Sequence, residues 1–82
     1  MIMKYLILEK DIYEHLIVFT PSIYHSEELK RHYGFIIKSA GSFEIKNGIL
    51  NLTHGSNSIG IPENEFQKVN DEKLISIYFG IY

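Results

Sequence analysis

The dipeptide Asn47-Gly48 constrains this chain more than any other feature, because it lies between two segments in which apolar and polar residues alternate. A two-residue hairpin turn of the favoured type needs positive φ at both central positions, and Asn-Gly meets that need well. A turn of this length also fixes the register of the two strands. The predicted pairs are Lys46 with Ile49, Ile45 with Leu50, Glu44 with Asn51, Phe43 with Leu52, and Ser42 with Thr53.

One side of this hairpin should be buried, because side chains alternate between the two faces of a strand. We expect Phe43, Ile45, Leu50 and Leu52 to lie in the core. The strand before the turn begins near Phe35, and Gly41 within it predicts a bend or bulge.

A second hairpin is predicted at the start of the chain. Residues 2–8 and 12–20 are apolar, β-branched runs, and the three polar residues Glu9-Lys10-Asp11 separate them. Pro21 cannot donate a ladder hydrogen bond, so the second run should end before it.

Two segments favour helices. Ser26 is a candidate N-cap, acids and then bases follow it, and Gly34 is placed to end the helix. The last segment is ambiguous: Asn70 and the acidic residues after it indicate a helix start, yet residues 75–81 also alternate as a strand would. We favour the helix, because the acidic first turn and Gly80 suit its two ends.

These elements predict an α+β fold with the order ββαββα. An antiparallel sheet of about four strands would carry both helices on one face. The 82 residues are too few for a second core, so residues 1–82 should form a single domain.

Composition excludes several classes of protein. The chain has no cysteine, which excludes disulfides, thiolate metal sites and cysteine nucleophiles. The expected compartment is therefore a reducing one, the cytoplasm of a host cell. No apolar run approaches the roughly 20 residues of a membrane span. The net charge is only −2, but it is dipolar: residues 9–28 are acidic and residues 29–46 are basic.

No pattern of catalytic residues stands out. His25, Glu28 and His32 share one helix face, but the two histidines are two turns apart, which suits a solvated face better than a metal site. The loop from His54 to Gly60 has the glycine spacing of a phosphate loop without the following Lys-Ser/Thr, and its serines and His54 lack the spacing of a hydrolase. We therefore expect no enzyme, no metal and no cofactor.

The second half of the chain carries a resemblance. Its residues are Ser39-Ala40-Gly41, Phe43, the loop Gly55-Ser56-Asn57-Ser58-Ile59-Gly60, Asp71 and Leu74-Ile75. In these the chain resembles small phage and prophage proteins of unknown function. The resemblance implies a gene product of a mobile element, and short proteins of that kind frequently bind and block a host protein.

The leading hypothesis is a phage-derived, non-enzymatic binding protein that blocks a host protein, such as a defence or nucleic-acid-handling complex, as an anti-CRISPR inhibitor does. An acidic, tyrosine-bearing surface would make the contact. Its predicted residues are Glu9, Asp11, Tyr13, Glu14, Tyr24, Glu27 and Glu28.

Three alternatives remain open at this point. A nucleic-acid-binding module would use Lys30, Arg31, Lys38 and Lys46, although the isoelectric point near 6.0 is low for that class. A small metal protein or hydrolase ranks lowest. A homodimer is also credible, because fourteen isoleucines and eleven aromatic residues exceed what one small core readily holds.

Overall fold

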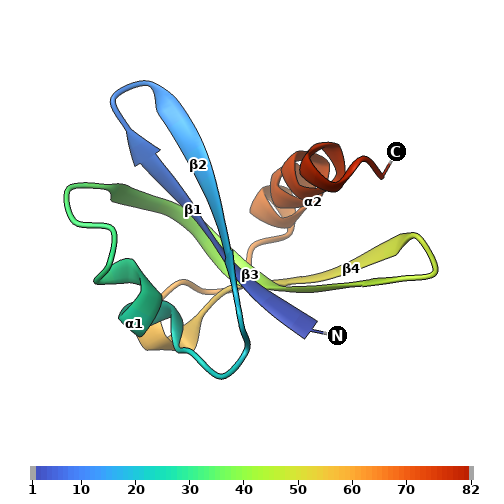
Figure 1. Cartoon of the computed structure of the whole chain (residues 1–82), viewed down its shortest axis with the longest axis horizontal. Helices are drawn as coiled ribbons and strands as arrows, with labels where there is room; N and C mark the ends of the chain where they lie inside the picture. The colour runs from blue at the N-terminus through green and yellow to red at the C-terminus, as the bar shows by residue number, and fades with distance from the viewer. Residues whose placement is uncertain (1, 82) are drawn as a thin grey trace.

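The computed structural model describes residues 2–81 and contains the predicted α+β architecture (Figure 1). Four strands, two helices and one 3-10 turn follow each other in the order ββαββα, with the 3-10 turn before the last helix. Their bounds are β1 Ile2–Lys10, β2 Tyr13–Phe19, α1 His25–Leu29, β3 Ile36–Lys46, β4 Ile49–His54, η1 Asn57–Ile59 and α2 Glu65–Phe79.

The four strands form one antiparallel sheet in the order β2-β1-β3-β4. The hairpin at Asn47-Gly48 is confirmed, since φ is 54° at Asn47 and 74° at Gly48 and all five predicted pairs are present. Phe43 and Leu52 are buried, while Ile45 and Leu50 are half-buried against the same cluster.

The first hairpin is confirmed with a shorter turn than predicted. β1 continues to Lys10, which pairs with Tyr13, so only Asp11 and Ile12 remain in the turn. Asp11 adopts the positive φ of 59° that such a turn requires. β2 ends at Phe19, two residues before Pro21.

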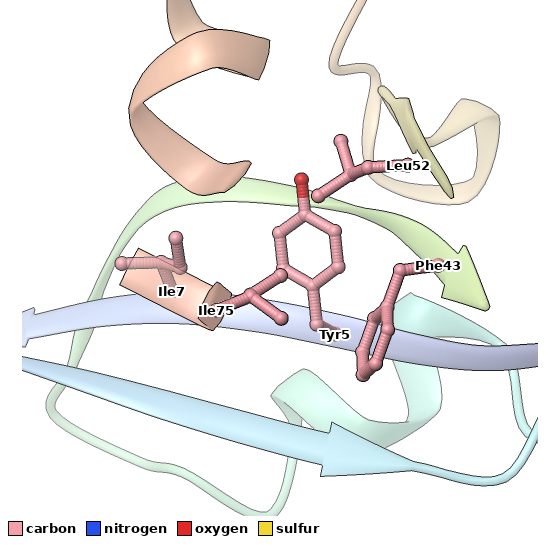
Figure 2. Packing of buried hydrophobic residues seen from close by; sticks show 5 residues of the cluster. All are labelled: Tyr5, Ile7, Phe43, Leu52 and Ile75. Atoms are coloured by element: carbon pink, nitrogen blue, oxygen red, sulfur yellow. The ribbon is translucent and has the colours of Figure 1, made fainter. Parts of the chain in front are cut away.

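β1 is one of the two inner strands and is apolar on both faces. Tyr5 and Ile7 lie on one face in a cluster with Phe43, Leu52 and Ile75, and Figure 2 shows the Tyr5 ring between Ile75 and Phe43. The alternate residues Leu6 and Leu8 belong to a second cluster on the other face, with members from β2, β3, α1 and η1. That cluster is Leu6, Leu8, Phe19 and Ala40, with Ile17, Ile23, Leu29, Phe35, Ile37, Ile59 and Ile61 packed against it.

The two helices therefore lie on opposite faces of the sheet, which corrects the expected placement of both on one face. α2 contributes Ile75 and Leu74 to the first cluster, and α1 contributes Leu29 to the second. The physical reason lies in β1, whose residues 5–8 are all buried and need cover from both sides.

The ambiguous last segment is a helix, as favoured, but it begins earlier than predicted. The N-cap is Asn64, not Asn70, and the Asn64 side chain accepts a hydrogen bond from the Gln67 backbone N–H at 2.9 Å. Asn followed three residues later by Gln is a capping pattern that the sequence already carried. Gly80 ends the helix in the left-handed region, as expected.

The first helix is shorter than predicted. It spans five residues, and its N-cap is Tyr24 instead of Ser26. The Tyr24 backbone N–H donates to the Glu27 carboxylate at 3.0 Å. The buried His25 ring anchors the first residue of the helix, so tertiary contacts override the local capping preference.

Gly41 has a different role from the one predicted. The bulge lies between Ile7 and Leu8, where Lys38 is the unpaired residue of β3. At Gly41 an added Cβ would lie 2.3 Å from the Thr53 carbonyl oxygen and 2.9 Å from the Tyr5 ring and hydroxyl. The glycine is therefore needed because Tyr5, its partner across the strands, lies over it.

Substitution Gly41→Ala should destabilise the fold by about 2 kcal/mol or more, because overpacking of this kind displaces backbone and the buried Tyr5 ring. Urea unfolding of the variant checks this, with Ser42→Ala in the same strand as the matched control. An unfolding midpoint for Gly41→Ala equal to that of the control would contradict the packing described here.

Candidate functional site

A buried carboxylate lies at the centre of the molecule. The Asp71 side chain is 1% exposed. Tyr5 donates its hydroxyl proton to Asp71 Oδ2 at 2.5 Å, and Ser39 donates to the same oxygen. Gln67 Nε2 donates to the other oxygen, Oδ1, at 2.9 Å. Asp71 thus joins α2 to β1 and β3 through charge-assisted hydrogen bonds.

His54 extends this network to β4. The Asn64 backbone N–H donates to His54 Nδ1 at 3.1 Å, so the ring proton of the neutral imidazole lies on Nε2. His54 Nε2 then donates to Ser39 Oγ at 2.9 Å. Within residues 2–81 every buried side-chain nitrogen and oxygen has a hydrogen-bond partner, so the network is satisfied.

The network contains Ser, His and Asp, but in the wrong order for a nucleophilic triad. Such a triad needs a histidine nitrogen that accepts the serine proton and a carboxylate that holds the other nitrogen. Here Ser39 donates to Asp71, and His54 donates to Ser39. Ser39 is also fully buried, so a substrate has no access to it. The arrangement is suited to holding the fold together.

Tyr5 contributes a permanent donor to this network. Burial, followed by the hydrogen bond to Asp71 and the charge of that carboxylate, raises the pKa of the Tyr5 hydroxyl far above its ordinary value. The hydroxyl therefore stays protonated at neutral pH and donates to Asp71.

A second buried polar cluster lies around His25 on the α1 side of the sheet. Its Nε2 is 2.8 Å from the Gly41 carbonyl oxygen and its Nδ1 is 2.8 Å from Ser56 Oγ. The carbonyl can only accept, so Nε2 carries the proton and Ser56 donates to Nδ1. Burial lowers the pKa of His25, which keeps the ring neutral.

The loop from His54 to Gly60 is thereby accounted for by structural contacts. Ser56 and Ile61 pair through both backbone hydrogen bonds, at 2.8 and 2.9 Å, and close the loop. His54 points to Ser39, and Ser56 points to His25, so the histidine and serine of the loop serve different clusters.

The three residues considered for a metal site do not converge. His25 is turned toward Gly41, while His32 Nε2 pairs with the Glu28 carboxylate at 2.9 Å. Among the described residues 2–81, no three His, Asp or Glu side chains are grouped so that they could hold a metal ion.

The predicted partner-binding residues fall into two groups. Glu9, Asp11, Tyr13 and Glu14 gather at the turn between β1 and β2, where Glu9 is paired with Glu14 across the strands. Tyr24, Glu27 and Glu28 lie at α1, and the Ile23 carbonyl just before it accepts from Lys4 Nζ at 2.9 Å. Lys4 is about 16 Å from Glu9 along β1, at roughly 3.3 Å per residue.

Three of these acids are engaged within the protein. Glu27 accepts from the Tyr24 backbone N–H at the start of α1. Glu28 is buried and holds His32. Glu14 forms an ion pair with Lys38 at 2.6 Å, and this contact raises the pKa of Lys38. Tyr24 has Lys4 Nζ over its ring, 5.3 Å from the centroid.

The predicted nucleic-acid-binding residues do not form one surface. Lys30 and Arg31 follow α1, whereas Lys38 pairs with Glu14 on the side of the sheet that α2 covers. Lys46 is at the β3–β4 turn, about 26 Å from Lys38 along the strand at roughly 3.3 Å per residue.

Comparison with known proteins adds no assignment, since no protein-family model, no curated protein and no solved structure matches the chain. In the part of the chain that the structure describes, no helix has both the length and the apolar character needed to cross a membrane.

The Asp71 network should dominate the stability of the fold. We expect Asp71→Asn to cost about 2 to 4 kcal/mol, because the amide loses the charge-assisted bonds and cannot accept from all of its buried donors. Urea unfolding measures the change, with the exposed Glu63→Gln as the control. A cost below about 0.5 kcal/mol, the range of ordinary surface substitutions, would contradict a central role for this carboxylate.

His25 should make the protein acid-sensitive. Its pKa is lower in the folded than in the unfolded chain, so its contribution to stability is present above about pH 6.5, the ordinary value, and is lost as pH falls below it. The free energy of unfolding, measured from pH 8 to pH 5, should therefore fall less for His25→Gln than for the wild type. Equal pH profiles would contradict the neutral, buried state of His25.

Proposed function

We propose that the protein is a small non-enzymatic binding protein of phage origin that occupies and blocks a surface on a host protein. A defence or nucleic-acid-handling complex is the class of target, as for an anti-CRISPR inhibitor, and the host cytoplasm is the compartment. The sequence resemblance supports the phage origin. The contact surface is supported by the residues at and beside the β1–β2 turn, which we call the hairpin end: Glu9, Asp11, Ile12, Tyr13, Glu14 and Ile36. Glu9 is half-buried, and the other five are exposed.

The observation that carries the proposal is the exposure of large apolar side chains at this end. Ile12 is 83% exposed and Tyr13 is 66% exposed. Ile12 occupies a two-residue turn, where Gly, Asn or Asp is usual. Within residues 2–81 neither of the two hydrophobic clusters includes its side chain. Ile36 is exposed beside them on β3, paired with Glu9. Burying one such side chain in a partner contributes about 1.5 to 3 kcal/mol.

The charges around these residues indicate the chemistry of the partner. Glu9 and Asp11 flank the apolar side chains. The base between them, Lys10, has its Nζ over the Phe35 ring, 5.2 Å from the centroid, and Glu14 is already paired with Lys38. Apolar anchors surrounded by a polar rim are typical of protein interfaces, and rim charges guide the encounter. The partner should therefore present an apolar pocket with a basic border.

The proposed contact surface leaves out three of the residues that the sequence predicts for partner binding. Tyr24 and Glu27 lie at α1, and Glu28 is buried against His32. These three residues are about five strand positions away from the hairpin end, so we assign them no role in the contact.

The test is a pull-down of tagged protein from nuclease-treated host lysate, with partners identified by mass spectrometry. A stoichiometric protein partner should be retained by the wild type and lost by Ile12→Ser/Tyr13→Thr. The control Ile49→Thr/Tyr24→Thr removes one isoleucine and one tyrosine that are also exposed, and it should retain the partner.

Two outcomes would contradict the proposal. Equal retention by both double variants would place the contact elsewhere. An empty pull-down from the nuclease-treated lysate, with nucleic acid recovered only when the nuclease is omitted and binding that weakens steeply as salt rises, would favour the alternative of a nucleic-acid-binding module.

A further inference from the structure

β2 lies at an edge of the sheet and directs part of its backbone away from the fold. Lys10 and Tyr13 close the two-residue turn as a hydrogen-bonded pair, and hydrogen-bonding positions alternate along an antiparallel strand. The odd-numbered residues of β2 therefore direct their N–H and C=O groups toward β1, and Glu14, Leu16 and Val18 direct theirs outward. Within residues 2–81 β1 is the only strand that pairs with β2, and none of the loop and cap hydrogen bonds reaches these outward groups.

The middle of this edge has none of the features that usually keep an exposed edge strand from pairing. Such features are charged side chains, prolines, bulges and elements that cover the edge. Residues 15–19 read His-Leu-Ile-Val-Phe, and their register with β1 has no bulge. The opposite edge, β4, differs because the start of α2 lies next to it. Residues 52–54 and 63–65 line one hollow, and the Asn64 N–H donates to His54 Nδ1.

The apolar side chains along the β2 edge are only partly covered within one copy of the chain. Leu16 and Val18 pack against the cluster under α2, and Ile17 packs against the cluster on the α1 side. All three are half-buried, whereas their partners in β1, residues 5–7, are buried. A strand added to this edge would cover these side chains further on both faces of the sheet, and burial of apolar area is favourable.

The sequence of β2 matches itself when two copies run antiparallel about a two-fold axis through Ile17. This axis places Ile17 opposite Ile17 of the second copy. It also places Leu16 opposite Val18 in two equivalent pairs, as an isologous interface requires. Leu16 and Val18 both direct their backbone groups outward, so each of these pairs can exchange both of its hydrogen bonds.

The neighbouring positions also fit this register. His15 lies opposite Phe19 of the second copy, and Glu14 lies opposite Thr20, so no two like charges meet. An axis moved by one residue, to Leu16, would instead place Glu14 opposite an apolar side chain. The axis through Ile17 is therefore the one that pairs apolar residues with each other on both faces.

We propose that β2 pairs with β2 of a second copy of this chain and joins the two four-stranded sheets into one antiparallel sheet. The unpaired N–H and C=O groups of an edge match an extended backbone, and β2 is itself an extended segment whose side chains fit. Apolar contacts around Ile17 supply the attraction. The paired segment covers residues 14–20, which leaves Ile12 and Tyr13 of the hairpin end outside it, so dimerisation and binding of a host protein can be tested separately.

The first experiment is amide hydrogen exchange of the purified full chain, followed by NMR over a concentration series up to about 1 mM, which reaches the range of weak association. The Leu16 and Val18 amides should exchange about tenfold or more slowly at the highest concentration than at the lowest, because dimerisation gives them acceptors. The Leu50 amide also points outward, from β4, and serves as the matched control. Its exchange should not depend on concentration.

Charge substitution at the two-fold axis tests the register. Ile17→Lys and Ile17→Glu each place like charges directly opposite each other, so each variant alone should dimerise about tenfold or more weakly than the wild type in sedimentation equilibrium. A mixture of the two should recover the dimer, because a lysine then meets a glutamate at the axis. Ile49→Lys and Ile49→Glu make the same changes at an exposed position of β4 and should dimerise as the wild type does. Circular dichroism checks that all four variants are folded.

Three results would overturn the proposal. A wild type that stays monomeric, with unprotected Leu16 and Val18 amides at every concentration, would leave this edge to a strand of another protein. Protection that rises at Leu50 instead would place the interface on β4. A mixture of the Ile17 variants that dimerises no better than either alone would exclude a two-fold axis at this residue. The exchange measurement needs no substitution, so it decides the matter even where a charge at Ile17 weakens the fold.

Discussion

The fold depends on a carboxylate that is shielded from water and surrounded by donors. An isolated charge in an apolar interior is strongly unfavourable, so Asp71 can be buried only where hydroxyl and amide donors already converge. Tyr5, Ser39 and Gln67 supply them from β1, β3 and α2. Correct docking of α2 and correct register of the sheet are therefore linked, because a slip in either leaves the charge without its partners.

The apolar core around this network is built on a single strand. β1 presents Tyr5 and Ile7 to α2, and Leu6 and Leu8 to α1 and η1. Two small clusters on opposite faces then share one backbone. Gly41 completes the arrangement because the Tyr5 ring occupies the space where a side chain would be, and this position lets the hydroxyl reach Asp71.

Much of the fold follows from local signals in the sequence. Asn47-Gly48 determines a turn and a register without help from the rest of the chain, and Pro21 and Gly80 mark ends that the structure confirms. Placing both helices on one face was wrong because local patterns do not reveal that Tyr5-Leu6-Ile7-Leu8 is buried on two sides. The start of α1 was missed for a related reason, since His25 is held by Gly41 and Ser56, which are distant in sequence.

The candidate sites also differ in whether local sequence indicates them. The hairpin end consists of neighbours in sequence, Glu9 to Glu14, apart from Ile36, which pairs with Glu9 from β3. The Asp71 network brings together residues separated by up to 66 positions, and in the sequence Asp71 looks like one more acid near the start of a helix. One feature of the sequence does indicate that Asp71 faces the core. Asp71 lies four residues after Gln67 and four before the apolar Ile75, so it shares their helix face.

The inner position of β1 has a consequence for how the chain folds. β1 and β2 can form a hairpin from residues 2–19 alone, but one edge of β1 stays unpaired until β3 arrives, with Ile2 paired to Glu44. The Tyr5 face stays uncovered until Asp71 and Ile75 dock. β1 is thus synthesised before the strand and the helix that shield it, and a newly made chain exposes the apolar residues of β1 until β3 and α2 have formed.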